Sequence, residues 1–402
     1  MNANGMRHME AEPTAFFKTE VDALKEKNLD WKIRELQGPS EGKGIVDGKE
    51  VIILCSNNYL GISNHSRLKK AAIAAVKKYG AGSGSVRAIA GTMDLHNRLE
   101  KKICEFKHVE SALYYQTGFA ANAGLIPQLV GEGDLIISDE LNHGSIIDGT
   151  RLSKAERKVY KHNNTEDLKR ILQETQGKHK RTLVVTDGVF SMDGDIAPLP
   201  QIAKVAKEFG AFTYVDDAHG EGVLGEGGRG VVSHFKLEGK IDIEMGTFSK
   251  AFGVVGGYVS GNRYLREFAL NKSRTWLLSG SAPPATAAAC IAAIELVEEK
   301  PQIVKKLWRN TNYYKKSLKK LGYDTGVSQT PITPIMLGES KVAQDFAAEL
   351  FKEGVFALPI VFPMVAQGKA RIRTMPTAAH SKEDLNEALA KIEKVGKQLK
   401  VI

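Results

Sequence analysis

The residues best suited to chemistry stand where predicted strands end. The apolar run 213–215 is followed by Asp216, and an imidazole, His219, stands three residues later. In open α/β sheets, ligands bind outside the carboxyl ends of the strands, so a carboxylate at Asp216 can meet a bound molecule. A lone aspartate at a strand end is, however, more often a helix cap. A second predicted strand, 183–186, brings its own polar end, 187–194, to the same edge of the sheet.

Lys250 is the candidate nucleophile. It follows a strand predicted over 241–245 and stands among small residues in the segment 246–253. An amine held in a confined, partly apolar place has a lowered pKa and can attack a carbonyl carbon, as a Schiff-base lysine must. The chain has 56 lysines and arginines, so one lysine is weak evidence by itself. Its position after the Asp216 segment strengthens the interpretation.

A candidate anion site begins at Gly118. The segment 115–122 leads into a predicted helix, and the free backbone N–H groups at a helix N-terminus bind anions such as phosphate. Glycine also lets a ligand approach the backbone closely. The common alternative is an ordinary helix start that happens to contain glycine.

Other motifs give no support to competing chemistry. Gly225, Gly227 and Gly230 match the spacing of a dinucleotide-binding string, but a glycine-rich loop rather than a strand precedes them, so we discount the match. The sequence contains neither a P-loop nor a serine elbow. It contains no HExxH string, and His143 is the one other suggestive histidine, so we expect no metal.

Two periodicities indicate the elements that must position these residues. Apolar residues at helical spacing predict amphipathic helices over 66–79 and 94–107. Through the middle of the chain, short β-branched runs such as 183–186 and 212–215 alternate with helical patterns. This alternation predicts βαβ units and a mostly parallel sheet covered on both faces.

In the last quarter of the chain, the alternation of short strands and helices gives way to long predicted helices. Long helices are predicted over 287–297 and 341–353, and a final helix begins at Ser381 with a variant capping box completed by Asp384. We therefore place a domain boundary near residue 290.

Length and composition limit the class of protein. With 402 residues, of which 42% are hydrophobic and 26% charged, the chain is expected to form two or three compact domains. Cys55, Cys104 and Cys290 are too widely spaced for a metal or redox pair and odd in number, which favours a reducing compartment. We expect a cytoplasmic protein without a membrane span, because the sequence shows no apolar signal region and no run approaching eighteen apolar residues.

The net charge of +9 is spread along predicted helix faces such as 315–320. Solvated helix surfaces explain this charge better than a nucleic-acid surface, so we expect no nucleic-acid partner. A moderate positive field also suits a small, phosphate-rich partner. The non-enzymatic alternative is a basic nucleic-acid or scaffold protein, which would make Asp216 and Lys250 incidental.

An amine, a strand-end carboxylate and an anion site are together what pyridoxal 5'-phosphate needs for its aldehyde, its ring nitrogen and its phosphate. The sequence resembles the α-oxoamine synthase family of fold-type I pyridoxal phosphate enzymes. The matching strings occur in family order from the first fifth of the chain to its end, at 56–61, 82–87, 141–149, 186–194, 215–219, 246–250 and 370–374.

The resemblance implies an α/β fold in which a large domain holds a mostly parallel seven-stranded sheet between helices, beside a smaller α+β domain. We expect residues 1–55 to form an N-terminal arm and part of the small domain. Residues 56–290 would form the large cofactor-binding domain, and residues 291–402 the C-terminal small domain.

The resemblance also implies roles toward the cofactor. Lys250 would hold the cofactor covalently and move protons, while Asp216 would pair with the ring nitrogen. The remaining contacts would be His143 on the ring face, His219 and Ser191 at the phenolic oxygen, and Gly118, Phe119 and Thr247 at the phosphate.

Substrates and a second subunit complete the implied site. Arg373 would hold the carboxylate of the amino acid, with Asn57 beside it, and His143 would also donate a hydrogen bond to the thioester oxygen. The family's second subunit reaches the phosphate with the segment that matches Ser279 and Gly280, so a homodimer with its active site at the subunit interface is implied. Relatives have a hydroxyl or amide side chain where this chain has Gly280, so the contact could instead come from Ser281.

Within the family, the segments 141–149, 194–199 and 368–374 most resemble the glycine C-acetyltransferases, also called 2-amino-3-ketobutyrate CoA ligases. The expected reaction is condensation of glycine with acetyl-CoA to 2-amino-3-oxobutanoate and CoA, in threonine and glycine metabolism. The alternative is an 8-amino-7-oxononanoate synthase, which joins alanine to a pimeloyl thioester with loss of carbon dioxide, or a family member of broad acyl specificity. Gly220 also occurs in relatives that use longer acyl chains, which leaves the acyl length open.

Overall fold

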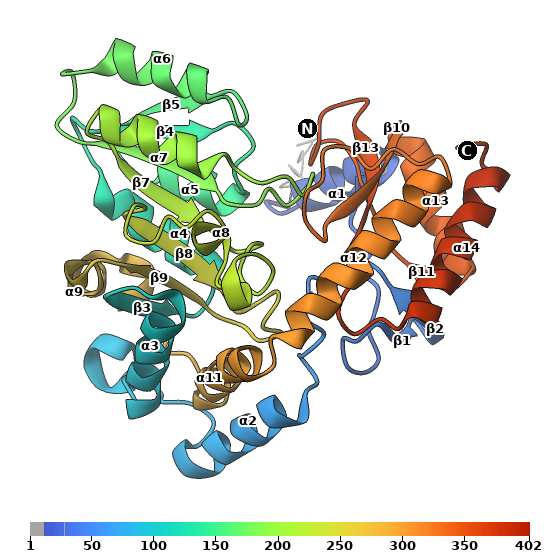
Figure 1. The fold of residues 1–402 in the computed structure, drawn as a ribbon, viewed down its shortest axis with the longest axis horizontal. Coiled ribbons are helices and arrows are strands. Elements are labelled where there is room, and N and C mark those ends of the chain that lie inside the picture. Colours follow the sequence, from blue (N-terminus) through green and yellow to red (C-terminus); the bar gives the residue numbers. More distant parts are fainter. Residues whose placement is uncertain (1–11, 28) are drawn as a thin grey trace, which may run out of the picture.

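The computed structural model describes residues 12–27 and 29–402, which form two packed parts (Figure 1). The larger part is built on a seven-stranded sheet in the order β3-β9-β8-β7-β6-β4-β5. β9 runs antiparallel to β3 and β8, and the other pairs are parallel. The strands are β3 (Ser111–Tyr115), β4 (Leu135–Asp139), β5 (Glu156–Tyr160), β6 (Thr182–Asp187), β7 (Phe212–Asp216), β8 (Ile243–Thr247) and β9 (Gly257–Gly261).

Both faces of this sheet are buried. Leu113 and Tyr115 of β3 belong to one apolar cluster, whereas their neighbours Ala112 and Tyr114 belong to another on the opposite face. The strands are therefore apolar on both sides, as a parallel sheet between two helical layers requires. The helices of this part are α2 (Ser66–Tyr79), α3 (Asp94–Lys107), α4 (Gly118–Leu129), α5 (Gly144–Arg151), α6 (Thr165–Thr175), α7 (Leu199–Glu208), α8 (Val231–His234), α9 (Arg263–Lys272), α10 (Arg274–Leu277) and α11 (Pro284–Glu299).

The smaller part combines segments from both ends of the chain. Residues 43–53 form a hairpin that pairs with residues 355–356, in the sheet β1-β2-β11. A second sheet has the order β10-β13-β12. Its elements are β1 (Lys43–Val46), β2 (Lys49–Ile53), β10 (Thr333–Gly338), β11 (Val355–Phe356), β12 (Leu358–Ile360), β13 (Ala370–Thr374), α12 (Gln302–Lys320), α13 (Ser340–Lys352) and α14 (Lys382–Gln398).

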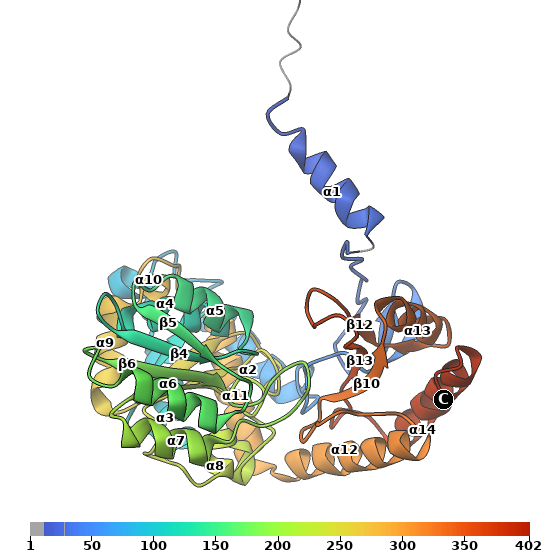
Figure 2. The same ribbon diagram turned by 90° about the horizontal axis from the view of Figure 1, so that it is seen from above.

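The first described helix, α1 (Phe16–Glu26), has no buried residue. Figure 2 shows it standing away from both packed parts. Across the described residues, no helix is both long enough and apolar enough to cross a membrane.

The predicted α/β fold with a mostly parallel sheet is confirmed, and so are the helices 66–79 and 94–107. The predicted strand 241–245 begins two residues later, at Ile243, because the Asp242 carboxylate accepts hydrogen bonds from the backbone and hydroxyl of Thr213. The predicted domain boundary at residue 290 falls inside α11, which packs against α2 and α3. The division into 1–55, 56–290 and 291–402 stays a prediction.

Candidate active site

Two carboxylates end neighbouring parallel strands. Asp187 of β6 and Asp216 of β7 are paired in register, and both are buried. One Asp216 oxygen accepts the backbone N–H of Ala218 at 3.0 Å, and the other accepts the side-chain amide of Asn122 at 2.7 Å. Burial raises the pKa of Asp187, and the negative charge of Asp216 raises it further. The sheet therefore presents a fixed carboxylate, Asp216, beside one that resists ionisation.

Asn122 ties Asp216 to the next loop. From inside α4, its amide nitrogen donates to Asp216 and to the Ser145 hydroxyl, at 2.7 and 2.9 Å, while its oxygen accepts from the Tyr214 hydroxyl at 2.8 Å. Both N–H groups and one lone pair of the Asn122 amide are used, so its orientation is fixed. Asn122 was not predicted as a site residue, although a buried-looking amide among the apolar residues of the first turns of α4 could have indicated it.

His143 stands at the N-terminus of α5. Its backbone N–H donates to Asp187 at 2.7 Å, and its ring nitrogen Nδ1 lies 2.7 Å from the Ser145 hydroxyl. The side chain is nevertheless exposed. The network thus connects His143 to Asp216 through Ser145 and Asn122 and leaves the imidazole face open to a ligand.

Lys250 follows β8 and is partly buried. Burial lowers the pKa of its amine to about 8, although the carboxylates of Asp216 and Asp187 act in the opposite direction. Within residues 12–27 and 29–402 the amine has no hydrogen-bond or ion-pair partner. A lysine of this kind is partly neutral near physiological pH and free to react.

The predicted anion cradle falls at the N-terminus of α4. Thr117 caps the helix by accepting the Ala120 N–H at 3.0 Å, whereas the N–H groups of Gly118 and Phe119 have no partner among the described residues. The Thr247 hydroxyl lies against Gly118, 3.5 Å from where a Cβ would stand. A Cβ at Gly257 would come within 2.5 Å of the Gly118 nitrogen, so β9 packs directly behind the cradle.

Arg373 reaches the site from β13 of the smaller part. Its Nε donates to the Ser191 carbonyl at 2.5 Å, and one terminal nitrogen donates to the side-chain oxygen of Asn57 at 3.2 Å. The Arg373 guanidinium is also near the Tyr59 hydroxyl, which lies 2.8 Å from Nδ1 of His219. The structure therefore brings Asn57, Ser191, His219 and Arg373 together and adds Tyr59. Their roles toward cofactor and substrate stay predictions.

Ser279 and Gly280 lie near the anion cradle of their own chain. Gln116 stands two residues before Gly118, and its side-chain amide donates to the Gly280 carbonyl. The Ser281 backbone N–H donates to the Ser85 carbonyl at 3.0 Å. The contact of this segment with a second subunit stays a prediction.

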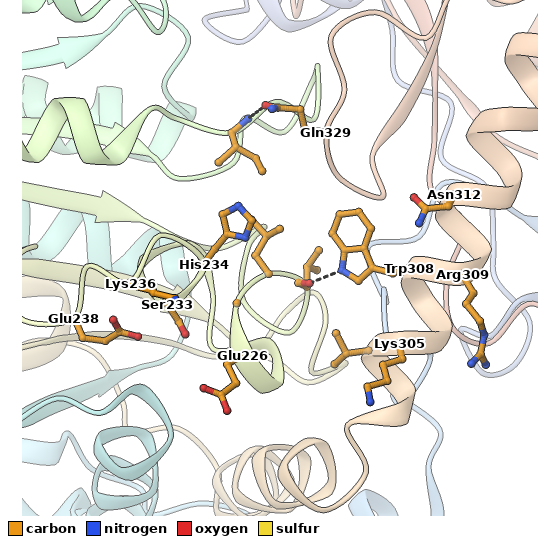
Figure 3. Close-up of a pocket in the computed structure, with 15 residues that line it drawn as sticks. Glu226, Ser233, His234, Lys236, Glu238, Lys305, Trp308, Arg309, Asn312 and Gln329 are labelled. Atoms are coloured by element: carbon orange, nitrogen blue, oxygen red, sulfur yellow. Dashed lines mark hydrogen bonds between the residues drawn. The ribbon is translucent and has the colours of Figure 1, made fainter.

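Two cavities are lined by residues other than these. The larger, of about 810 Å³, lies between α12 and the segment 223–238, which includes α8. There the Trp308 ring nitrogen donates to the Val223 carbonyl (Figure 3). This cavity is lined by none of the predicted site residues. The smaller, of about 550 Å³, is lined by Leu141 and Asp193 among others, which stand two residues from His143 and Ser191 along the chain.

The donor set fits pyridoxal phosphate. The free N–H groups of Gly118 and Phe119 suit a phosphate, the Lys250 amine suits an aldehyde, and the fixed Asp216 carboxylate suits a protonated ring nitrogen. Each of these groups has bonding capacity that the described part of the protein does not use.

Comparison with known proteins gives the same class. A family model described as aminotransferase class I and II matches residues 49–392. An 8-amino-7-oxononanoate synthase from Symbiobacterium thermophilum is 56% identical over 97% of this chain and 99% of its own length, and one from Thermoanaerobacter pseudethanolicus is 55% identical over 96% and 98%. The structure of a serine palmitoyltransferase from S. paucimobilis with bound PLP and myriocin is similar at a TM-score of 0.91 and 30% identity, over 97% of this chain and 98% of that one.

These relatives overturn the expected condensation of glycine with acetyl-CoA. Four of them, at 53% to 56% identity, carry the name 8-amino-7-oxononanoate synthase, which was the alternative interpretation. The wrong prediction of glycine and acetyl-CoA was based on segments that support the candidate site. Residues 141–149 cover the turn before α5 and most of that helix, and residues 370–374 form β13. A Cβ at Gly194 would lie 2.6 Å from the Ile332 carbonyl. Supporting segments that related enzymes share do not determine which acyl chain binds in the active site.

Proposed function

The chain belongs to the aminotransferase class I and II family and uses pyridoxal phosphate, and from this we propose that it is an 8-amino-7-oxononanoate synthase. The proposed reaction joins alanine to a pimeloyl thioester and releases carbon dioxide and the free thiol, in biotin synthesis. The observation that carries the proposal is the 56% and 55% identity, over nearly the full length, to two enzymes of that name.

Residues at the strand ends would hold the cofactor. Bound pyridoxal phosphate supplies an electron sink for the α-carbon of the amino acid. Asp216, fixed by Asn122 and the Ala218 N–H, would pair with the ring nitrogen, and the free N–H groups of Gly118 and Phe119 would bind the phosphate. Lys250, with its pKa of about 8, would remove the proton from the α-carbon, because an amine that is partly neutral at the working pH can act as a base.

Arg373 would bind the carboxylate of alanine. Ser191 and Asn57 already hold two of its nitrogens, so the guanidinium is oriented before the substrate arrives, and a carboxylate can use its remaining N–H groups. His143, exposed at the start of α5, would donate a hydrogen bond to the thioester oxygen. Preorganised donors of this kind stabilise charge that develops on a carbonyl oxygen.

A homodimer is part of the proposal. Apolar side chains are exposed around the cofactor-binding residues, with Phe119 at 53%, Leu278 at 68% and Ile89 at 83% exposure. Phe119 follows Gly118, and Leu278 precedes Ser279. Exposed apolar groups in this number beside a site favour burial against a second copy. Sedimentation velocity would support the proposal with a dimer and contradict it with a monomer at micromolar concentration.

The deciding experiment compares two substrate pairs. Thiol release is measured for L-alanine with pimeloyl-CoA and for glycine with acetyl-CoA, and the two kcat/KM values are compared because specificity is their ratio. Carbon dioxide release is followed in parallel, with Lys250→Ala as the inactive control. Preference for the first pair, with one carbon dioxide per thiol, supports the proposal. Preference for the second pair, or thiol release without carbon dioxide, contradicts it.

A further inference from the structure

Tyr59 and His219 form a buried pair beside the candidate site. Tyr59 is 1% exposed and His219 is 8% exposed. The Tyr59 hydroxyl lies 2.8 Å from Nδ1 of His219, and the two rings meet edge to face with centroids 6.1 Å apart. The pair joins the loop after β2 to the segment after β7, across 160 residues of sequence.

The direction of this hydrogen bond follows from the neighbours of the hydroxyl. Burial raises the pKa of Tyr59 to about 12, although the Arg373 guanidinium nearby lowers it, so the phenol keeps its proton at neutral pH. Arg373 has only N–H groups and cannot accept that proton. Within the described residues, the acceptor that remains is Nδ1 of His219. The opposite direction would leave a buried O–H group unpaired, which is costly.

His219 is a neutral imidazole in this environment. Burial holds its pKa well below the ordinary value, and the positive charges of Lys250 and Arg373 act in the same direction. A neutral imidazole carries one proton, on one of its two ring nitrogens. Because Nδ1 accepts from Tyr59, the proton must be on Nε2, for which the described part of the chain provides no acceptor.

We propose that Tyr59 is a positioning residue that fixes His219 as the Nε2–H tautomer and so aims one N–H donor into the cofactor site. The acceptor would be an oxygen of the cofactor ring, so this inference rests on the proposed function. In the other tautomer His219 would present a lone pair to that oxygen and repel it. Tyr59 also connects this donor to Arg373, the residue proposed to bind the substrate carboxylate.

The test determines directly which ring nitrogen of His219 carries the proton. Protein labelled with ¹⁵N-histidine is examined by NMR as apoprotein, with His219→Gln used to assign the His219 signals. The expected wild-type pattern is an unprotonated Nδ1 and a protonated Nε2. In Tyr59→Phe, which keeps the ring contact, we expect a mixture of the two neutral tautomers and a dissociation constant for pyridoxal phosphate that is up to about tenfold larger, as loss of one hydrogen bond implies.

Tyr314→Phe is the matched control, because it removes another buried hydroxyl from the core of the smaller part. It should leave the His219 signals and the cofactor affinity unchanged. A protonated Nδ1 in the wild-type apoprotein would overturn the inference even if Tyr59→Phe did not fold. So would a Tyr59→Phe spectrum and affinity equal to wild type. Failure of the alanine and pimeloyl-CoA assay, with the tautomer as expected, would count against the proposed reaction alone.

Discussion

Asn122 donates a hydrogen bond from the interior of α4 to Asp216 at the end of β7, over 2.7 Å. The helix that begins with the proposed anion cradle at Gly118 is thereby connected to the strand that ends in the carboxylate. The bond sets the distance between the two points at which a cofactor would be held, its phosphate and its ring nitrogen. Precise placement of such groups depends on the residues that support them.

Replacing Asn122 with alanine should weaken cofactor binding. The change removes a donor to a charged group, and hydrogen bonds of that kind contribute about 1.5–3 kcal/mol, so we expect the dissociation constant for pyridoxal phosphate to rise roughly 10- to 100-fold. Equilibrium dialysis of the apoprotein measures it. Asn271→Ala removes an exposed amide and should have no effect. A folded Asn122→Ala protein with wild-type affinity would contradict the proposed role of the pair.

Lys250 should react with an amine reagent at lower pH than ordinary lysines do. A lysine with a pKa of about 8 is about half neutral at pH 8, whereas one near 10.5 is less than about 1% neutral. Labelling of the apoprotein with trinitrobenzenesulfonate, followed by peptide mass spectrometry, should show Lys250 modification levelling off above about pH 9. Exposed Lys101 is the comparison site, and pyridoxal phosphate should protect Lys250. A Lys250 rate that still climbs tenfold per pH unit from 8 to 10 would contradict the lowered pKa.

Local sequence signals predicted much of the site. Asp216, Gly118 and Lys250 each follow or begin an element whose own periodicity is visible in the sequence, so their positions at the sheet edge could be inferred. The contacts between distant segments could not. Tyr59 meets His219 across 160 residues, and Asn57 meets Arg373 across 316. Such contacts depend on how the two parts of the molecule pack, which no local pattern encodes.

The acyl substrate could not be predicted from sequence motifs for a related reason. The strings that suggested acetyl-CoA form α5, β13 and the Gly194 turn, which support the reacting groups. Acyl length depends on the shape of the space beyond those groups. Pocket shape arises from many side chains that share no spacing in the sequence, so motif matching identified the family and missed the substrate.

A buried charge cluster lies behind the strand ends. The Lys107 amine is 3.0 Å from Glu244, 3.3 Å from Glu221 and 3.5 Å from Asp217, all of them buried. Burial raises the pKa values of Asp217 and Glu221, because one ammonium shared among three carboxylates compensates only partly. Glu221 in turn accepts the Thr247 N–H at 3.1 Å, so the cluster supports the strand that leads to Lys250.

Lys107→Met should strongly destabilise the protein. It leaves three buried carboxylates without their ammonium, and breaking a buried ion pair costs about 3–5 kcal/mol. Urea unfolding at pH 7.5 measures the loss. The loss should shrink as the pH falls, because protonation removes the uncompensated charges. Lys101→Met, at a lysine whose side chain is 79% exposed, should change stability by less than about 0.5 kcal/mol. A similarly small change for Lys107→Met would contradict this account of the cluster.

The contribution of His162 to the folding stability should decrease at alkaline pH. Its ring nitrogens lie 3.0 Å from Asp139 and 2.8 Å from Asp195. Burial alone would lower the pKa of His162, but the hydrogen bonds and charges of these two carboxylates outweigh it and raise the pKa to about 10. Since the folded-state pKa exceeds the unfolded value of about 6.5, the contribution is complete below pH 6.5 and is lost as the pH rises through about 10.

Melting temperatures of His162→Gln and wild type at pH 6, 8 and 10 test this relationship. We expect the variant to melt several degrees lower at pH 6, where the imidazolium is fully formed. The difference should narrow steadily toward pH 10, because the wild-type imidazole then loses its charge. His234→Gln, at an exposed histidine with no ion pair to any described residue, should show no pH-dependent difference. A gap between His162→Gln and wild type that stays constant from pH 6 to 10 would mean that His162 contributes packing rather than charge.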